Sequence, residues 1–243
     1  MVPMTSPLLP ARFLFRFSAV CKYRDPLWTD QGADLDPTYR LPGLAGLEGR
    51  AVWADVRAAW SEAGLAFSVR VEGKKEAAPP SVGRGSRHRP ERQTSSYLSP
   101  EQSDGLHVWI DTRDVHNVHR ANRFCHRFAF LVPDAGARPA VGRGSAAADS
   151  PALFLPINRA REQPRPVQEG TVRARFQAIA GGYLLESLVP AEALTGFDPA
   201  EHSRLGFTYA VLDREFGEQT FGVGSPMPYR EDPSLWATLE LTK

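Results

Sequence analysis

Apolar and polar residues alternate with a period of two along most of the chain, a pattern typical of β-strands with one buried face. In the segment that begins at Leu65, for example, Phe67, Val69 and Val71 alternate with smaller or polar residues. No segment has a sustained helical repeat. The pattern therefore predicts a protein built from many short strands.

Two pairs of these segments have the spacing of β-hairpins. In the first, the strands flank residues 61–64, and Gly64 supplies the positive φ of the turn. The second covers residues 171–190, where the two glycines at 181–182 fit a tight turn. A single helical turn over residues 191–194 is expected to follow it.

The remaining expected strands cover residues 11–17, 104–111, 123–132, 204–213 and 235–243. Many short strands separated by Gly and Pro turns are typical of an antiparallel β-sandwich. A chain of 243 residues can bury a complete core without disulfides. We therefore expect a single all-β domain over residues 1–243, with long irregular loops and little helix.

Two segments lack the alternation. Residues 73–100 are rich in Pro, Ser and Arg, and residues 134–150 are rich in small residues. Both contain Val-Gly-Arg-Gly-Ser, but neither copy lies between a strand and a helix, so a phosphate-binding loop is not indicated. We interpret both as flexible insertions, which offer a possible docking surface for a partner protein.

Composition and charge exclude several classes of function. The formal net charge is +1, which gives no reason to expect nucleic acid or an anionic membrane as a partner. No apolar run is long enough to span a membrane, and the N-terminal residues do not resemble a secretory signal. We therefore expect a cytoplasmic protein whose Cys21 and Cys125 stay reduced.

The segment from Asp111 to Phe128 contains three of the six histidines. His116 and His119 are three residues apart, so in a helical turn both could hold one zinc ion, provided that a third ligand is found. Asp111 and Asp114 similarly suggest calcium, although calcium needs more oxygen ligands. The alternative is a polar loop in which these side chains form a turn network.

Cys125 and His126 do not form a convincing nucleophile pair. Neighbouring residues on a strand face opposite sides, and His126 lies on the face that carries the phenylalanines. His107 and Trp109 also share one face of a strand, and Arg113 follows. That face could bind a polar ligand, or it could pack beneath the long loops.

The order of these segments resembles the family 9 carbohydrate-binding modules and the related DOMON-like sandwiches. The resemblance covers residues 51–243 and is more specific for fold than for function. The positions that carry it are Asp104, Ile110, Asp111, Tyr183, Glu186, Pro190, Leu194, Gly206, Phe207, Asp213, Asp232, Pro233, Ser234 and Leu241.

The resemblance implies a β-sandwich that binds the end of a sugar chain between two aromatic rings. Tyr229 falls where the family has one of these rings. The second ring would fall near Glu101, where this chain has no aromatic residue, and Trp28 is a substitute from another loop. An acidic residue of the sugar binders is replaced by His107.

We therefore expect a non-catalytic binding or accessory protein whose ligand is a carbohydrate or another small polar molecule. Tyr229 would stack on the ligand, His107, Arg113 and Arg120 would donate hydrogen bonds, and no cofactor would be needed. One alternative is an enzyme or redox module that uses zinc or haem in the region 116–126, with Met227 as a haem ligand. A protein-interaction scaffold is the other.

Overall fold

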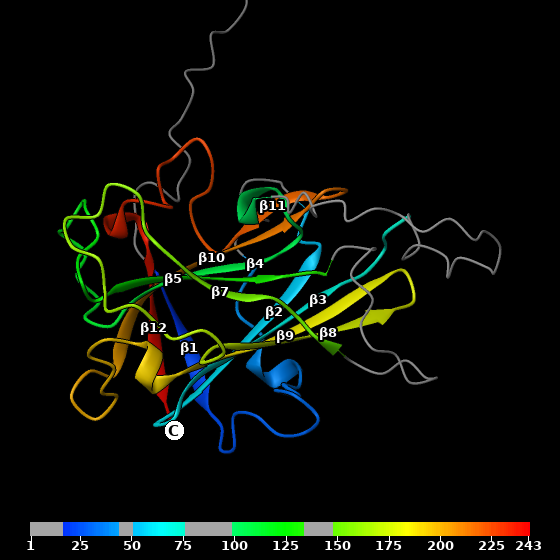
Figure 1. Ribbon diagram of the computed structural model, residues 1–243, viewed down its shortest axis with the longest axis horizontal. Helices are drawn as coiled ribbons and strands as arrows, with labels where there is room; N and C mark the ends of the chain where they lie inside the picture. Colours follow the sequence, from blue (N-terminus) through cyan, green and yellow to red (C-terminus); the bar gives the residue numbers. More distant parts are fainter. Residues whose placement is uncertain (1–16, 44–50, 76–98, 134–147) are drawn as a thin grey trace, which may run out of the picture.

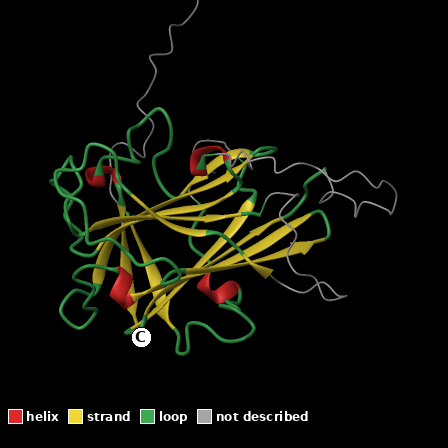
Figure 2. Ribbon diagram, viewed as in Figure 1, coloured by secondary structure: helices red, strands yellow, loops and turns green. Residues whose placement is uncertain are grey.

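The computed structural model describes residues 17–43, 51–75, 99–133 and 148–243. The described part consists of strands, loops and single turns of 3-10 helix (Figure 2). The strands are β1 (Ser18–Tyr23), β2 (Ala54–Ser61), β3 (Gly64–Val71), β4 (Gly105–Asp111), β5 (Cys125–Leu131), β6 (Ala148–Asp149), β7 (Ala152–Leu155), β8 (Arg173–Ile179), β9 (Gly182–Pro190), β10 (Arg204–Asp213), β11 (Gly217–Thr220) and β12 (Ala237–Thr242). The 3-10 turns are η2 (Pro37–Tyr39), η4 (Pro100–Gln102), η5 (Ala191–Ala193) and η6 (Pro233–Leu235).

The strands form one sheet that curls over into a sandwich (Figure 1). Its strand order is β6-β8-β9-β3-β2-β1-β12-β10-β4-β5-β7, with β11 paired to β10. One layer contains β2, β3, β8 and β9, and the other contains β4, β5, β7 and β10. Strands β1 and β12 connect the layers. The predicted all-β sandwich is confirmed.

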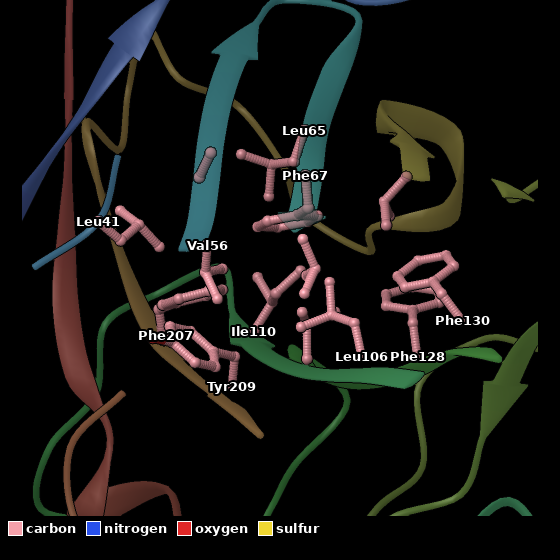
Figure 3. Close-up of a cluster of buried hydrophobic side chains, with 14 of the residues drawn as sticks. Leu41, Val56, Leu65, Phe67, Leu106, Ile110, Phe128, Phe130, Phe207 and Tyr209 are labelled. Carbon is pink, nitrogen blue, oxygen red and sulfur yellow. The ribbon is translucent and has the colours of Figure 1, made fainter. Parts of the chain in front are cut away.

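The main hydrophobic core fills the space between the two layers, as alternation predicted. Leu106 and Ile110 of β4, Phe128 of β5 and Phe67 of β3 all point into it (Figure 3). The rings of Phe67 and Phe207 stack across the two layers with their centroids 5.8 Å apart. Burial of this many aromatic and branched side chains supplies the main driving force for folding.

The strand β1 is parallel to both of its neighbours, β2 and β12, whereas the other described pairs of strands are antiparallel. Alternation gives the face of each residue but contains no information on strand direction, so sequence analysis did not predict this parallel pairing. The strand expected at residues 11–17 lies outside the described residues, apart from Phe17.

Both predicted hairpins are present, with one change of turn. Gly64 has a φ of 137° and lies so close to β9 that a Cβ there would meet the carbonyl of Val189. In the second hairpin, Ile179 pairs with Gly182, so the turn is Ala180–Gly181 and not the two glycines. The 3-10 turn η5 follows β9 as predicted.

The two segments interpreted as insertions lie mostly outside the described residues, at 76–98 and 134–147. The described ends of both segments take part in the fold, whereas flexible insertions were predicted. Ala148 and Asp149 form β6, and Lys74 makes buried ion pairs. The proposed partner-docking role of both segments stays a prediction. Where the chain is described, no helix combines the length and apolar character needed to cross a membrane.

Candidate functional site

The outer face of the β4–β5–β10 layer carries a second buried cluster. On β4, Leu106, Val108 and Ile110 point into the main core, so His107 and Trp109 point outward. They are nevertheless fully buried, because the loops before β4 and before β12 cover them. The structure thus supports the alternative in which this face packs beneath long loops.

A charged group of side chains surrounds Trp109 at this place, and we call it the Arg127 cluster. It draws residues from η4, β4, β5, β11 and the loop before η6. Its members are Glu101, His107, Trp109, Arg127, Glu218, Tyr229 and Arg230.

Arg127 is the centre of the cluster and is only 6% exposed. It pairs with Trp109 across the β4–β5 ladder, and its guanidinium lies 5.3 Å from the centroid of that indole. Its Nη2 donates to Glu101 Oε1 at 3.0 Å. Burial lowers the pKa of Arg127, but a guanidinium keeps its charge inside proteins.

His107 connects Arg127 to the loop before β4. His107 Nε2 lies 3.1 Å from the carbonyl oxygen of Pro100, which can only accept, so Nε2 carries the proton. The other nitrogen, Nδ1, then accepts from Arg127 Nη2 at 3.4 Å. Burial, together with the charges of Arg127 and Arg230, lowers the pKa of His107 to about 4, so the ring stays neutral near pH 7.

Tyr229 closes the other side of the cluster. Its ring meets Trp109 edge to face with centroids 5.5 Å apart. Its hydroxyl donates to Glu218 and accepts from Arg230 Nε at 3.0 Å. Burial and the carboxylate of Glu218 raise the pKa of this hydroxyl, which therefore stays protonated.

Two donors of the cluster are left without a partner. The indole Nε1 of Trp109 and the Nε of Arg127 are buried and make no hydrogen bond to another described residue. A buried unpaired N–H costs about 1–3 kcal/mol, so each such group requires an explanation, such as a bound water or ligand. Both donors are covered in this conformation, so they can donate to an oxygen-rich ligand after a partly exposed side chain of the rim, such as Glu101, moves away.

The structure corrects the predicted role of Tyr229. Tyr229 is 1% exposed, because Trp109 and Trp236 pack around it, and Trp236 Nε1 donates to its carbonyl oxygen at 2.7 Å. A ring buried in this way cannot present its face to a sugar. Trp109 is also fully buried and cannot be a stacking platform.

Three other predicted ligand-binding residues lie outside the Arg127 cluster. Trp28 packs on a separate small core with Leu27 and Leu35. Arg113 donates to the carbonyl oxygen of Gly196 at 2.7 Å, and Arg120 donates to that of Arg159 at 2.9 Å. Both arginines therefore hold loops together.

The predicted metal pair does not assemble. His116 Nε2 lies 2.8 Å from Asp114, whereas His119 is exposed and its Nδ1 contacts Asp232 at 3.2 Å. Within the described ranges, no three His, Cys, Asp or Glu side chains are grouped closely enough to hold a metal ion. The carboxylate of Asp111 instead accepts the N–H groups of Arg113 and Val115, as the turn-network alternative predicted.

Cys125 and His126 face opposite sides of β5, as expected. Burial raises the pKa of Cys125 to about 12, so its thiol is not a nucleophile near neutral pH. Burial lowers the pKa of His126 to about 4, and its Nε2 accepts the N–H of Thr195 at 2.9 Å. Met227 is partly buried and packs against the hydrophobic cluster that contains Trp109 and Tyr229. The haem interpretation stays a prediction.

Arg127, Glu218 and Arg230 were not among the residues predicted from the sequence. The sequence did contain a signal for Arg127, which lies in the middle of the apolar run from Phe124 to Val132. An arginine in a buried strand must be paired with another group or have a function. Glu218 and Arg230 had no such signal, since both lie in polar segments whose contacts depend on the folded loops.

Two solved structures are similar to this one over nearly its whole length. A family 9 carbohydrate-binding module from Caldicellulosiruptor kristjanssonii in complex with glucose matches with a TM-score of 0.57 at 10% identity, over 93% of this chain and 96% of that chain. A family 9 module from the same organism in complex with cellotriose matches with a TM-score of 0.54 at 10% identity, over 93% and 94%. This chain folds like a family 9 carbohydrate-binding module.

The resemblance to the family 9 modules, inferred from the order of the strands, is thereby confirmed at the level of the fold. No family model and no curated protein matches the sequence. The likeness to the family 9 modules thus lies in the sandwich, and the ligand has to be argued from the side chains.

Proposed function

We propose that the protein is a non-catalytic binding protein that holds a saccharide, or another small polar molecule, at the Arg127 cluster. The structurally similar modules are complexes with glucose and cellotriose, which supports a carbohydrate ligand at the level of the fold. The observation that carries the proposal is the pair of buried, unpaired N–H donors of Trp109 and Arg127.

The chemistry of the cluster suits a saccharide. Sugar hydroxyl and ring oxygens accept hydrogen bonds, and Arg127 offers a fixed fork of donors that is held over Trp109. Glu101 lies at the rim with 44% of its side chain exposed, so it can move away and let a ligand reach Arg127. Glu218 and Arg230, also partly exposed, can read further hydroxyl groups.

A glycan array followed by calorimetric titration tests this proposal, beginning with glucose and cellotriose. Arg127→Lys keeps the charge but removes the fork, and we expect at least about a tenfold loss of affinity because charged hydrogen bonds contribute about 1.5–3 kcal/mol. Trp109→Phe removes the unpaired indole N–H while keeping an aromatic ring, and should weaken binding by a smaller factor.

Arg120→Lys is the matched control, since Arg120 is an exposed arginine that bonds only to a neighbouring carbonyl group among the described residues. It should bind like the wild type. The titration is repeated after EDTA treatment and with added calcium or zinc, and we expect no change. A blank array, or an Arg127→Lys variant with unchanged affinity, would show that the site does not bind saccharides.

A further inference from the structure

A groove opens where β1 and β2 separate, away from the Arg127 cluster. Strand β1 pairs with β2 at only two positions near the end of β2. Further back along β2, the chain around Arg40 takes the place of β1, and Leu41 N–H donates to Val56 at 2.8 Å. The groove there has a volume of about 520 Å³, and none of its lining residues belongs to the Arg127 cluster.

Charged side chains form one wall of the groove in a fixed arrangement. Asp55 accepts from Arg40 Nε at 3.0 Å and from Arg57 Nη2 at 2.7 Å. Arg57 Nη1 also donates to the carbonyl oxygen of Leu35 at 2.6 Å. Burial opposes the charge of Asp55, but the two arginines outweigh it and hold the pKa of Asp55 below its usual value.

Arg70 lies across the β2–β3 ladder from Asp55 and has donors to spare. Its Nε donates to Glu72 at 2.6 Å, and no hydrogen bond joins either Nη of Arg70 to another described residue. Its side chain is 45% exposed. With Arg40, Arg57 and Arg70 against Asp55 and Glu72, the lining carries three positive and two negative charges, a net charge of +1.

An aromatic ring lies beside these charges. Trp53 is partly exposed, and its ring stacks on Phe216 with the centroids 5.3 Å apart. The N–H groups of Trp53 and Ala54 both donate to Gln219 Oε1 at 2.9 Å, so the ring is carried on rigid backbone. Val52 also lines the groove, and it is one of two large hydrophobic residues in the described part that are about half exposed.

We propose that this groove is a second binding site, and that its ligand is an acidic saccharide. The sugar ring packs on Trp53 and Val52, because the C–H faces of pyranoses pack against apolar and aromatic surface. The acidic group, a carboxylate or a sulfate, takes the free Nη donors of Arg70, since guanidinium groups bind such groups with two parallel hydrogen bonds.

The test is calorimetric titration of the full-length chain with trigalacturonate, a sulfated disaccharide and neutral cellotriose. We expect the two acidic probes to bind at the groove, with an affinity that falls as salt is added. Arg70→Gln should weaken acidic-probe binding about tenfold or more. Glu72→Gln removes the carboxylate that competes for Arg70 and should strengthen binding several-fold. Arg173→Gln, an exposed arginine on β8, should leave binding unchanged.

The same titrations separate this inference from the proposed function. Arg127→Lys should leave acidic-probe binding intact, and Arg70→Gln should leave cellotriose binding intact. If neither acidic probe binds, or if binding is insensitive to Arg70→Gln and Glu72→Gln, the groove is not a site for acidic saccharides. If acidic-probe binding disappears in Arg127→Lys, the probes bind at the Arg127 cluster and the second site is refuted. If one of the two acidic probes binds and the other does not, the result identifies whether the groove recognises a carboxylate or a sulfate.

Discussion

Lys74 and Arg127 are both largely buried cations, but the protein neutralises them in different ways. Lys74 Nζ lies 2.5 Å from Asp213 and 3.4 Å from Asp104, and both carboxylates are buried. The remaining oxygen atoms of these carboxylates accept backbone N–H groups, including that of Arg214 at 2.9 Å. Arg127, by contrast, has one carboxylate partner, Glu101, which is partly exposed.

The difference separates a structural ion group from a candidate binding group. The charges around Lys74 are paired with one another and with backbone N–H groups of described residues. At Arg127, one N–H is unpaired and the single counter-charge can be hydrated if it moves away. We therefore expect substitutions at Lys74 to act on stability and substitutions around Arg127 to act mainly on binding.

The largest expected effect is that of Lys74→Met. The substitution leaves the buried carboxylate of Asp213 without its cation, whereas Asp104 keeps the guanidinium of Arg214 at 3.1 Å. Loss of one partner of a buried ion pair should lower the free energy of unfolding by about 3–5 kcal/mol. Urea denaturation measures this, with Lys22→Met, an exposed lysine on β1, as the control. A loss below about 1 kcal/mol would show that the buried ion group is not structural.

Acidification should give the next largest effect. The pKa values of His107 and His126 are both lowered to about 4 by burial, whereas a histidine in the unfolded chain titrates near 6.5. The unfolded state then binds more protons, so the free energy of unfolding falls as the pH drops from about 6.5 to 4, on the order of 2 kcal/mol per histidine.

Protonation of His107 also removes the acceptor for Arg127 Nη2 and places two cations side by side. Burial raises the pKa values of Asp111 and Glu186. The folded state therefore binds protons at these two residues more readily than the unfolded state does, so their contribution to the free energy of unfolding rises in acid. Comparison with a variant isolates the histidine contribution. His107→Gln should lose less stability than the wild type over the same interval, and equal losses would contradict the assignment.

Removal of Arg127 should cost less stability than removal of Lys74. In Arg127→Met, the stranded carboxylate of Glu101 can turn into water, and the loss is limited to packing on Trp109 and the hydrogen bonds. We expect a decrease of about 1–2 kcal/mol in the free energy of unfolding. If Arg127→Met instead destabilises as strongly as Lys74→Met, Arg127 has a structural role like that of Lys74.

The smallest expected effect is that of Glu101→Gln. An ion pair with a partly exposed carboxylate contributes about 0.2–1 kcal/mol, so the melting temperature should change little. Because the carboxylate competes with the ligand for Arg127, affinity for a bound saccharide should rise about two- to fivefold. Weaker binding would show that Glu101 itself contacts the ligand.

The fold could be predicted to a large extent because its information is local. Alternation in a strand such as β4 indicates which side chains point inward. Gly64 indicates a turn, because the turn requires a positive φ, which glycine adopts readily. The direction of β1 is not local, since it depends on partners at both ends of the chain.

The candidate site was less predictable, because it is made of contacts between segments far apart in the sequence. Tyr229 was expected at the surface, but its exposure depends on how the loop before η6 packs on Trp109. Lys74 belonged to a segment interpreted as flexible because its neighbours are polar. Its role depends on two carboxylates that precede β4 and end β10, which no local pattern brings together.

The position of β1 has a consequence for how the protein is made. Residues of β1 pair in parallel with β12, so Ser18 lies beside Thr238 and Lys22 beside Thr242. This contact closes the sandwich, and it cannot form until β12 has emerged from the ribosome. Until β12 is available, the edges of β1 and β10 that β12 covers stay unpaired. Unpaired strand edges promote association with other chains. Closure of the sandwich therefore has a high contact order, so we expect it to be slow compared with formation of the hairpins.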